Sequence, residues 1–109
     1  MKDIKNFDQL VSICEEITKK HTVHSSVESR VYTNYGWGSV AIMTDSFGGT
    51  HTHLHYDLET GEVTNWYGMK DEQVIENIDQ LINVIIKSEA ALLKGRDLNA
   101  IADFINAEY

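Results

Sequence analysis

Three histidines alternate with other residues over a short stretch, THTHLHY at residues 50–56. Successive side chains of a β-strand point to opposite faces, so residues two apart share a face. The pattern therefore predicts that His51, His53 and His55 project from one side of a strand and that its apolar residues project from the other. Imidazole is a good ligand for zinc and nickel. A zinc or nickel site at these histidines is accordingly one hypothesis.

Strand geometry limits this hypothesis. Histidines two apart lie about 6.5–7 Å from each other at Cα, whereas His51 and His55 are about 13 Å apart. Only two of the three are therefore expected to bind one tetrahedral ion, with a further ligand from elsewhere in the chain. The residues of suitable type near this stretch are His21, His24, Glu28 and Asp57. The alternative is a polar strand that faces solvent or a partner and holds no cofactor.

The histidine strand is half of a predicted β-hairpin. Asp57 to Glu62 reads as a loop built on a type I turn, in which Gly61 supplies the residue with positive φ. Alternation resumes at Val63, and Trp66 falls on the same face as the histidines. The hairpin thus has an apolar face for the core and an outer face of imidazole and indole rings.

Aromatic residues also mark the outer side of the neighbouring elements. Tyr32 lies on the outward face of a strand predicted at 27–35, and Trp37 lies in a glycine-flanked turn before a strand at 39–45. Tryptophan and tyrosine outside the core are enriched at protein interfaces. Tyr32, Trp37 and Trp66 are therefore predicted partner-binding residues, although Trp66 could instead simply cover His53 across the hairpin.

Helices are predicted before and after these strands in the sequence. Residues 7–20 have apolar residues at three- and four-residue spacing after the N-cap Asn6, and Cys14 lies on this stripe as a buried residue. Residues 71–94 form the longest predicted helix, which Gly95 ends before a last helix capped by Asp97. The fold class is α+β in one domain, residues 1–109. It has an N-terminal helix, a four-stranded antiparallel sheet and two C-terminal helices packed on one sheet face.

Charge points to the kind of partner. The chain carries a net charge of −8, and eight acids against three bases lie in residues 71–109. Such a chain is a poor ligand for phosphate backbones, so direct nucleic-acid binding is not expected. Glu72, Glu76 and Asp79 share one face of the predicted long helix and are expected to meet a basic protein surface. The alternative is that the acidity only keeps the protein soluble.

Enzymatic activity is not indicated. The sequence has no phosphate-binding glycine loop, no paired-cysteine motif and no His-Glu-x-x-His motif. Ser25 and Ser26 follow His24 directly, but adjacency in sequence does not define a catalytic triad. A lone cysteine, the charged start of the chain and the lack of a long apolar run favour a cytoplasmic protein without a membrane segment.

The order of elements and the acidity together resemble the small phage-encoded anti-CRISPR inhibitors of Cas9, across the whole chain. The resemblance rests on topology and charge rather than on a motif, so it assigns no functional residue. It implies a non-enzymatic inhibitor that occupies the basic nucleic-acid-binding site of a host defence protein such as Cas9. The alternatives are a metal-binding domain that uses the His-x-His-x-His strand, and a homodimer formed through the outer sheet face.

Overall fold

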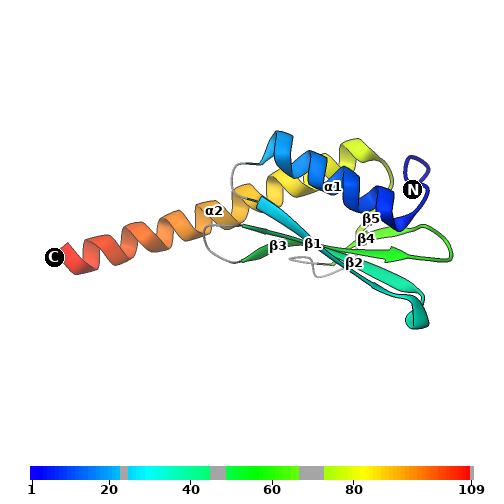
Figure 1. Cartoon of the computed structure of the whole chain (residues 1–109). Coiled ribbons are helices and arrows are strands. Elements are labelled where there is room, and N and C mark those ends of the chain that lie inside the picture. Colours follow the sequence, from blue (N-terminus) through cyan, green and yellow to red (C-terminus); the bar gives the residue numbers. More distant parts are fainter. Residues whose placement is uncertain (23–24, 45–48, 67–72, 109) are drawn as a thin grey trace.

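The computed structural model describes residues 1–22, 25–44, 49–66 and 73–108, with side chains in the last helix as far as Leu93. The elements follow in the order α1 (Phe7–His21), β1 (Ser25–Tyr32), η1 (Thr33–Tyr35), β2 (Trp37–Thr44), β3 (Thr50–Asp57), β4 (Val63–Asn65), β5 (Gln73–Ile75) and α2 (Ile78–Glu108). The predicted α+β class is confirmed (Figure 1).

The strands form one antiparallel sheet in which spatial order follows chain order, β1-β2-β3-β4-β5. The sheet has five strands among the described residues, so the prediction of four was wrong. The missed strand, β5, pairs with β4 and forms one edge, and β1 forms the other. Consecutive antiparallel pairing needs only short connections, which fits the closely spaced turn signals of the sequence.

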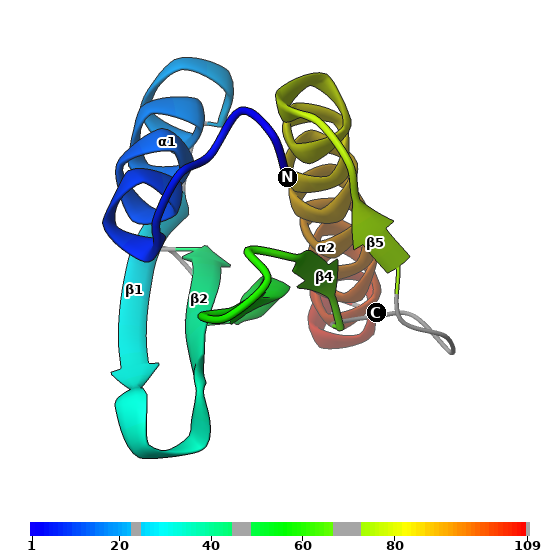
Figure 2. The same ribbon diagram turned by 90° about the vertical axis from the view of Figure 1, so that its right-hand side faces the viewer.

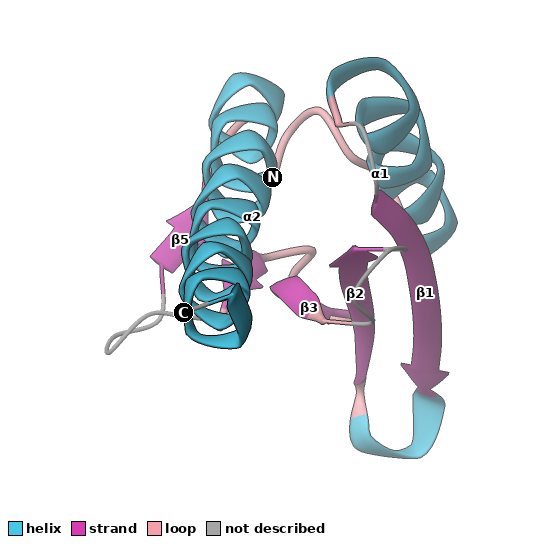
Figure 3. Cartoon of the chain, turned by 90° about the vertical axis from the view of Figure 1, so that its left-hand side faces the viewer, coloured by secondary structure: helices cyan, strands magenta, loops and turns pink. Residues whose placement is uncertain are grey.

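α1 and α2 lie on the same side of the sheet, and within the described residues no α-helix covers the opposite face (Figures 2 and 3). Between the two layers lies the core, which α1, α2, strands β2 to β5 and the segment before α1 supply: Ile4, Leu10, Cys14, Ile17, Val40, Ile42, Leu54, Tyr56, Val63, Ile75, Leu81 and Ile85. Cys14 is buried as predicted, and burial raises its pKa to about 12, which keeps the thiol protonated. The sheet therefore has one packed face and one open face.

α1 begins where the sequence predicted. The side chain of Asn6 accepts a hydrogen bond from the backbone N–H of Gln9 at 2.8 Å, as expected of an N-cap. The apolar stripe of α1 then packs on the sheet, and the Phe7 ring lies against Gly38 of β2 and 5.8 Å from the Tyr56 ring. A glycine lets this ring approach the strand backbone, which fixes α1 over the β1–β2 hairpin.

The hairpin between β3 and β4 has the predicted loop. Gly61 has φ of 76° and its N–H donates to the Asp57 carbonyl at 2.8 Å. The Asp57 carboxylate accepts from the N–H groups of Glu59 and Thr60 at 2.8 and 3.0 Å, which closes the turn from within. The loop therefore holds β3 and β4 in the register that pairs His55 with Thr64.

The C-terminal half departs from the prediction. Residues 73–75 form β5 rather than the start of a helix, and α2 begins only at Ile78. Asn77 caps α2, since its side chain accepts from the N–H of Gln80 at 2.8 Å, while the Gln80 side chain accepts from the N–H of Glu76 at 2.9 Å. The sequence contained this Asn-x-x-Gln signal, which the run of acidic residues before it obscured.

α2 also continues through Gly95 to Glu108, so the predicted break and second helix are absent from the described backbone. One glycine costs a helix only about 1 kcal/mol, and the flanking Lys94 and Arg96 are good helix formers. The far half of α2 projects beyond the sheet (Figure 1), and the molecule extends 57 Å along its longest axis. Among the described helices, none combines the length and apolar character that crossing a bilayer requires.

Candidate functional site

Aromatic rings gather on the open face of the sheet. Tyr32 ends β1, Trp37 begins β2, His55 lies on β3 and Trp66 directly follows β4. Tyr32 and Trp37 are opposite one another in the β1–β2 register, and His55 is diagonal to Trp37 across β2 and β3. Four neighbouring segments thus place these side chains on one face, opposite the helices. We call Tyr32, Trp37, His55 and Trp66 the aromatic cluster.

The rings of the aromatic cluster touch. The ring centroids of Trp37 and His55 are 4.9 Å apart, those of His55 and Trp66 are 4.7 Å apart, and those of the two indoles are 6.3 Å apart. These separations describe a compact triangle, in which each of the three rings lies against the other two. Tyr32 extends the cluster, with its ring centroid 4.4 Å from that of Trp37. Such contacts stabilise the rings in one arrangement before any partner arrives.

Backbone contacts hold Trp66 in place although it lies outside β4. Its N–H donates to the His53 carbonyl at 2.9 Å, which continues the β3–β4 ladder by one residue. The His53 ring meets the Trp66 indole edge-on at a centroid distance of 6.1 Å. Trp66 is nevertheless 40% exposed, so a large part of its indole remains accessible to another molecule.

A carboxylate lies beside the rings. Asp57 is opposite Trp37 in the register of β2 and β3 and occupies the same face as His55. The N–H groups of Thr60 and Glu59 donate to its side chain and lower its pKa, with a smaller contribution from His55. Asp57 is therefore anionic at neutral pH, and the aromatic cluster has a fixed negative charge at its margin.

The structure brings the predicted aromatic residues together and separates the predicted histidines. Trp37 is the first residue of a strand rather than part of a turn, and this position turns its side chain toward Tyr32 and Trp66. His55 belongs with these rings, which the sequence did not indicate, because its stacking partners come from β2 and from the residue that follows β4. Alternation on β3 placed His55 outward but gave no information about the residues diagonal to it.

His51 is not on the open face, contrary to the prediction. The register of β2 and β3 shifts between Ile42 and Met43, so His51 is an extra residue in β3 and its side chain is buried. A β-bulge of this kind re-aims a side chain relative to strict alternation. Within the described ranges, no group of three histidine, cysteine, aspartate or glutamate side chains is placed to hold a metal ion. The predicted set of three outward histidines is therefore not formed.

His51 instead joins a polar network between the sheet and α2. The Ser25 hydroxyl donates to the Glu89 carboxylate and lies 2.8 Å from His51 Nε2, and His51 Nδ1 lies 2.8 Å from Thr52 Oγ1. Because Ser25 has one hydroxyl hydrogen, His51 Nε2 donates to it and Nδ1 accepts from Thr52. In a catalytic triad the acid contacts the histidine, not the serine. The arrangement is that of a buried network that connects β1, β3 and α2.

This network predicts a loss of stability in mild acid. Burial lowers the pKa of His51 against an opposing effect of Glu89, and burial with the nearby His55 lowers the pKa of His53. The unfolded chain therefore binds more protons than the folded chain below about pH 6.5, so the free energy of unfolding falls as pH decreases. Urea unfolding at pH 7.5 and 5.5 measures this change.

The same experiment on His51→Gln is expected to show a weaker dependence on pH between 5.5 and 7.5. This range lies above the titration of Asp57 and Glu16, whose pKa values are lowered by hydrogen bonds to Thr60 and Lys20 respectively. Equal stability of the wild type at both pH values would contradict the prediction.

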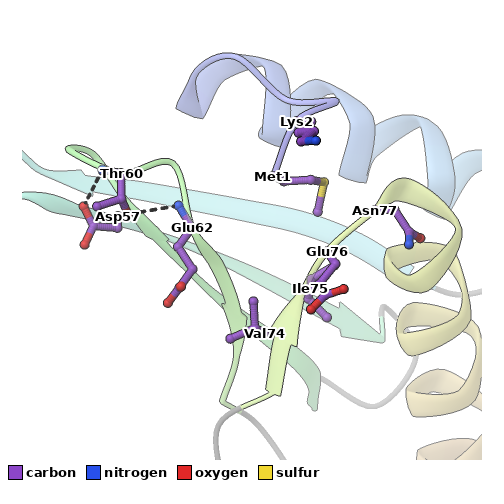
Figure 4. Close-up of a pocket in the computed structure, with 9 residues that line it drawn as sticks. All are labelled: Met1, Lys2, Asp57, Thr60, Glu62, Val74, Ile75, Glu76 and Asn77. Carbon is purple, nitrogen blue, oxygen red and sulfur yellow. Dashed lines mark hydrogen bonds between the residues drawn. The ribbon is translucent and has the colours of Figure 1, made fainter.

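The predicted acidic residues do not share one helical face. Glu72 lies outside the described residues, Glu76 lies between β5 and α2, and Asp79 lies in the first turn of α2. Glu76 lines a hollow of about 690 Å³ below the start of the chain (Figure 4). Glu62, Asp57 and the cation Lys2 are among the other described lining residues. This end of the domain is thus acidic, but its carboxylates come from separate segments.

Comparisons with known proteins identify no family for this chain. No family model matches it, and no curated protein or solved structure matches it either.

Proposed function

We propose that the chain is a non-enzymatic interaction protein that binds a positively charged surface of a partner protein through the aromatic cluster. The supporting observation is the contact of Trp37, His55 and Trp66 on the sheet face that lies opposite α1 and α2 (Figure 2). Core aromatic residues pack under helices, whereas these rings pack on one another in the open. Pre-arranged, accessible tryptophans are typical of residues that dominate binding energy at interfaces.

The chemistry of the cluster favours cationic side chains on the partner. An indole ring attracts arginine and lysine over its face, worth about 0.5–2 kcal/mol depending on solvent exposure. Asp57 adds a fixed negative charge beside Trp37. The net charge of −8 also favours approach to a basic surface at long range. The partner that fits best therefore carries arginine or lysine around an apolar centre.

A narrower proposal concerns the identity of this partner. A nucleic-acid-binding enzyme presents a basic groove, and an acidic protein of phage or other mobile origin that fills the groove would inhibit it. A host defence protein such as Cas9 is one such enzyme, and a cytoplasmic location follows from this proposal. Glu76 and Asp79 would contribute charge from the helical layer rather than from the aromatic face. The mimicry of nucleic acid by these carboxylates stays a prediction.

The proposal predicts that Trp66→Ala weakens partner binding by roughly tenfold or more, as expected of an interface tryptophan. The partner is first captured from host lysate on immobilised wild-type protein and identified by mass spectrometry. The affinity of the purified partner is then measured for wild type, Trp66→Ala and the control Ile86→Ala. Ile86 is an exposed apolar residue of α2, in the other layer of the molecule.

Measurements at several salt concentrations separate the contribution of charge to binding from the contribution of the aromatic cluster. Raising the ionic strength is expected to weaken wild-type binding, because the attraction of an acidic protein to a basic surface is screened. Ile86→Ala is expected to bind like the wild type at every salt concentration. If Trp66→Ala and wild type bound the partner equally well, the aromatic cluster would not be the binding site.

A further inference from the structure

β1 is an edge strand of eight residues, and within the described parts of the chain no strand pairs with its outer side. Such an edge presents unpaired N–H and C=O groups that favour pairing with another strand. The second half of β1 is also exposed, and Val31 is 47% exposed. We propose that a second copy of this chain pairs with β1 in antiparallel orientation, so that two five-stranded sheets join into one.

The residues of β1 define the register of this pairing. A two-fold axis through Ser29 places Ser29 opposite its own counterpart in the second copy. Glu28 of each copy is then opposite Arg30 of the other, and both side chains lie on the open face of the sheet. Opposite charges that face each other across neighbouring strands stabilise the pair. The symmetry forms this pair twice.

Other symmetric registers are disfavoured by the same two charges. Shifting the axis to residue 28 sets Glu28 against Glu28, and shifting it to residue 30 sets Arg30 against Arg30. Like charges directly opposite each other are destabilising. A two-fold axis placed between two residues would set open-face residues opposite packed-face residues, which the alternation of a strand does not allow. Charge and alternation therefore favour the axis at Ser29 over axes at or between the adjacent residues.

The packed face of β1 fits the same register. Val27 and Val31 point to the helical side: Val27 is opposite the buried Ile42 of β2, and Val31 is opposite Gly38, whose helical side faces the Phe7 ring. With the axis at Ser29, Val31 of each copy lies opposite Val27 of the other. The exposed Val31 side chain thereby gains an apolar neighbour, and pairs of β-branched residues across strands stabilise a sheet. One register satisfies both faces of β1.

Glu28 and Arg30 are placed to receive a second copy. Together with Tyr32 and residues of β2 they line a shallow hollow of about 190 Å³ on the open face. Side chains of a second β1 strand would enter this hollow from the edge. Because the two-fold axis is perpendicular to the sheet, both aromatic clusters would lie on one continuous face. The dimer therefore leaves the proposed partner-binding face open, and the inference does not depend on that function.

Sedimentation equilibrium of the full chain at several concentrations tests the pairing. Wild type is expected to show a reversible monomer–dimer equilibrium. Glu28→Arg and Arg30→Glu are each expected to weaken dimerisation by about tenfold or more, since each creates two like-charge pairs. The controls are Glu59→Arg and Lys87→Glu, which change the net charge equally at exposed positions away from β1.

Mixing the two β1 variants gives the sharper result. A chain with arginine at 28 and 30 is complementary to a chain with glutamate at both positions, so the mixture is expected to form a heterodimer. The double exchange E28R/R30E is expected to recover the wild-type dimer affinity. A wild type that stays monomeric would overturn the proposal. A dimer whose affinity is unchanged by the charge reversals, or is weakened equally by the control substitutions, would also overturn it. A mixture that associates no better than its separate components would overturn it as well.

Discussion

Leu81→Ala is expected to lower the free energy of unfolding by roughly 2–5 kcal/mol, the usual range for a leucine removed from a core. Leu81 lies on α2 with 0% of its surface exposed, among core residues from both the helices and the sheet. Truncation removes its buried methyl groups and leaves a cavity between the two layers. Urea unfolding monitored by circular dichroism gives the change in free energy.

Ile86→Ala is the matched control for this prediction. Ile86 lies on the same helix but is 37% exposed, so its truncation removes less burial and leaves no closed cavity. A loss well below that of Leu81→Ala is expected. If both variants lost the same stability, α2 would not pack on the sheet through Leu81.

Gly38→Ala is expected to destabilise the fold by about 1–3 kcal/mol, because it forces an extra methyl group into a filled space. A Cβ atom at residue 38 would lie 2.5 Å from Phe7 Cε1 and 2.7 Å from Phe7 Cδ1. The Phe7 ring would have to leave the β2 backbone, and its contact with the Tyr56 ring would change. The measurement is again urea unfolding.

A double-mutant cycle identifies the cause. If the clash with Phe7 is responsible, Gly38→Ala is expected to cost less in a Phe7→Ala background than in the wild type. Ser39→Ala, on the neighbouring residue of β2, is expected to cost little because its side chain points to the open face. Equal costs of Gly38→Ala with and without the Phe7 ring would exclude the clash.

Local sequence signals predicted much of the fold. The Asn6 cap, the stripe containing Leu10 and Cys14, and the loop that ends at Gly61 all depend on residues close together in the chain. Such signals can be interpreted without knowledge of the tertiary structure. The two-layer α+β arrangement followed from them, because amphipathic helices and alternating strands must bury their apolar sides against each other.

The errors arose where distant contacts outweigh local pattern. The acidic residues around Glu76 suggested a helix start, but Gln73–Ile75 instead forms a strand that is stabilised by pairing with β4. Gly95 suggested a helix end, but no local signal is strong enough to stop α2 there. The bulge that buries His51 depends on the partner strand, and alternation along β3 cannot reveal it.

The candidate site was predictable as a list of residues but not as an arrangement. Tyr32, Trp37 and Trp66 were identified by residue type and outward position, yet their contact depends on three strand registers. His55 was assigned to a metal hypothesis because it is one of three alternating histidines. Its place between Trp37 and Trp66 follows only from the sheet.

The bulge in β3 also bears on how this strand tolerates changes in length. Losing one residue from a strand ordinarily moves every following side chain to the opposite face. Here Thr50 and Thr52 already pair with the adjacent residues Met43 and Ile42, so a chain that lacked His51 would pair regularly through the same positions. The aromatic cluster would keep its place while the buried network lost its imidazole. Deletion of His51 during evolution would thus leave the side chains of the rest of β3 on their present faces.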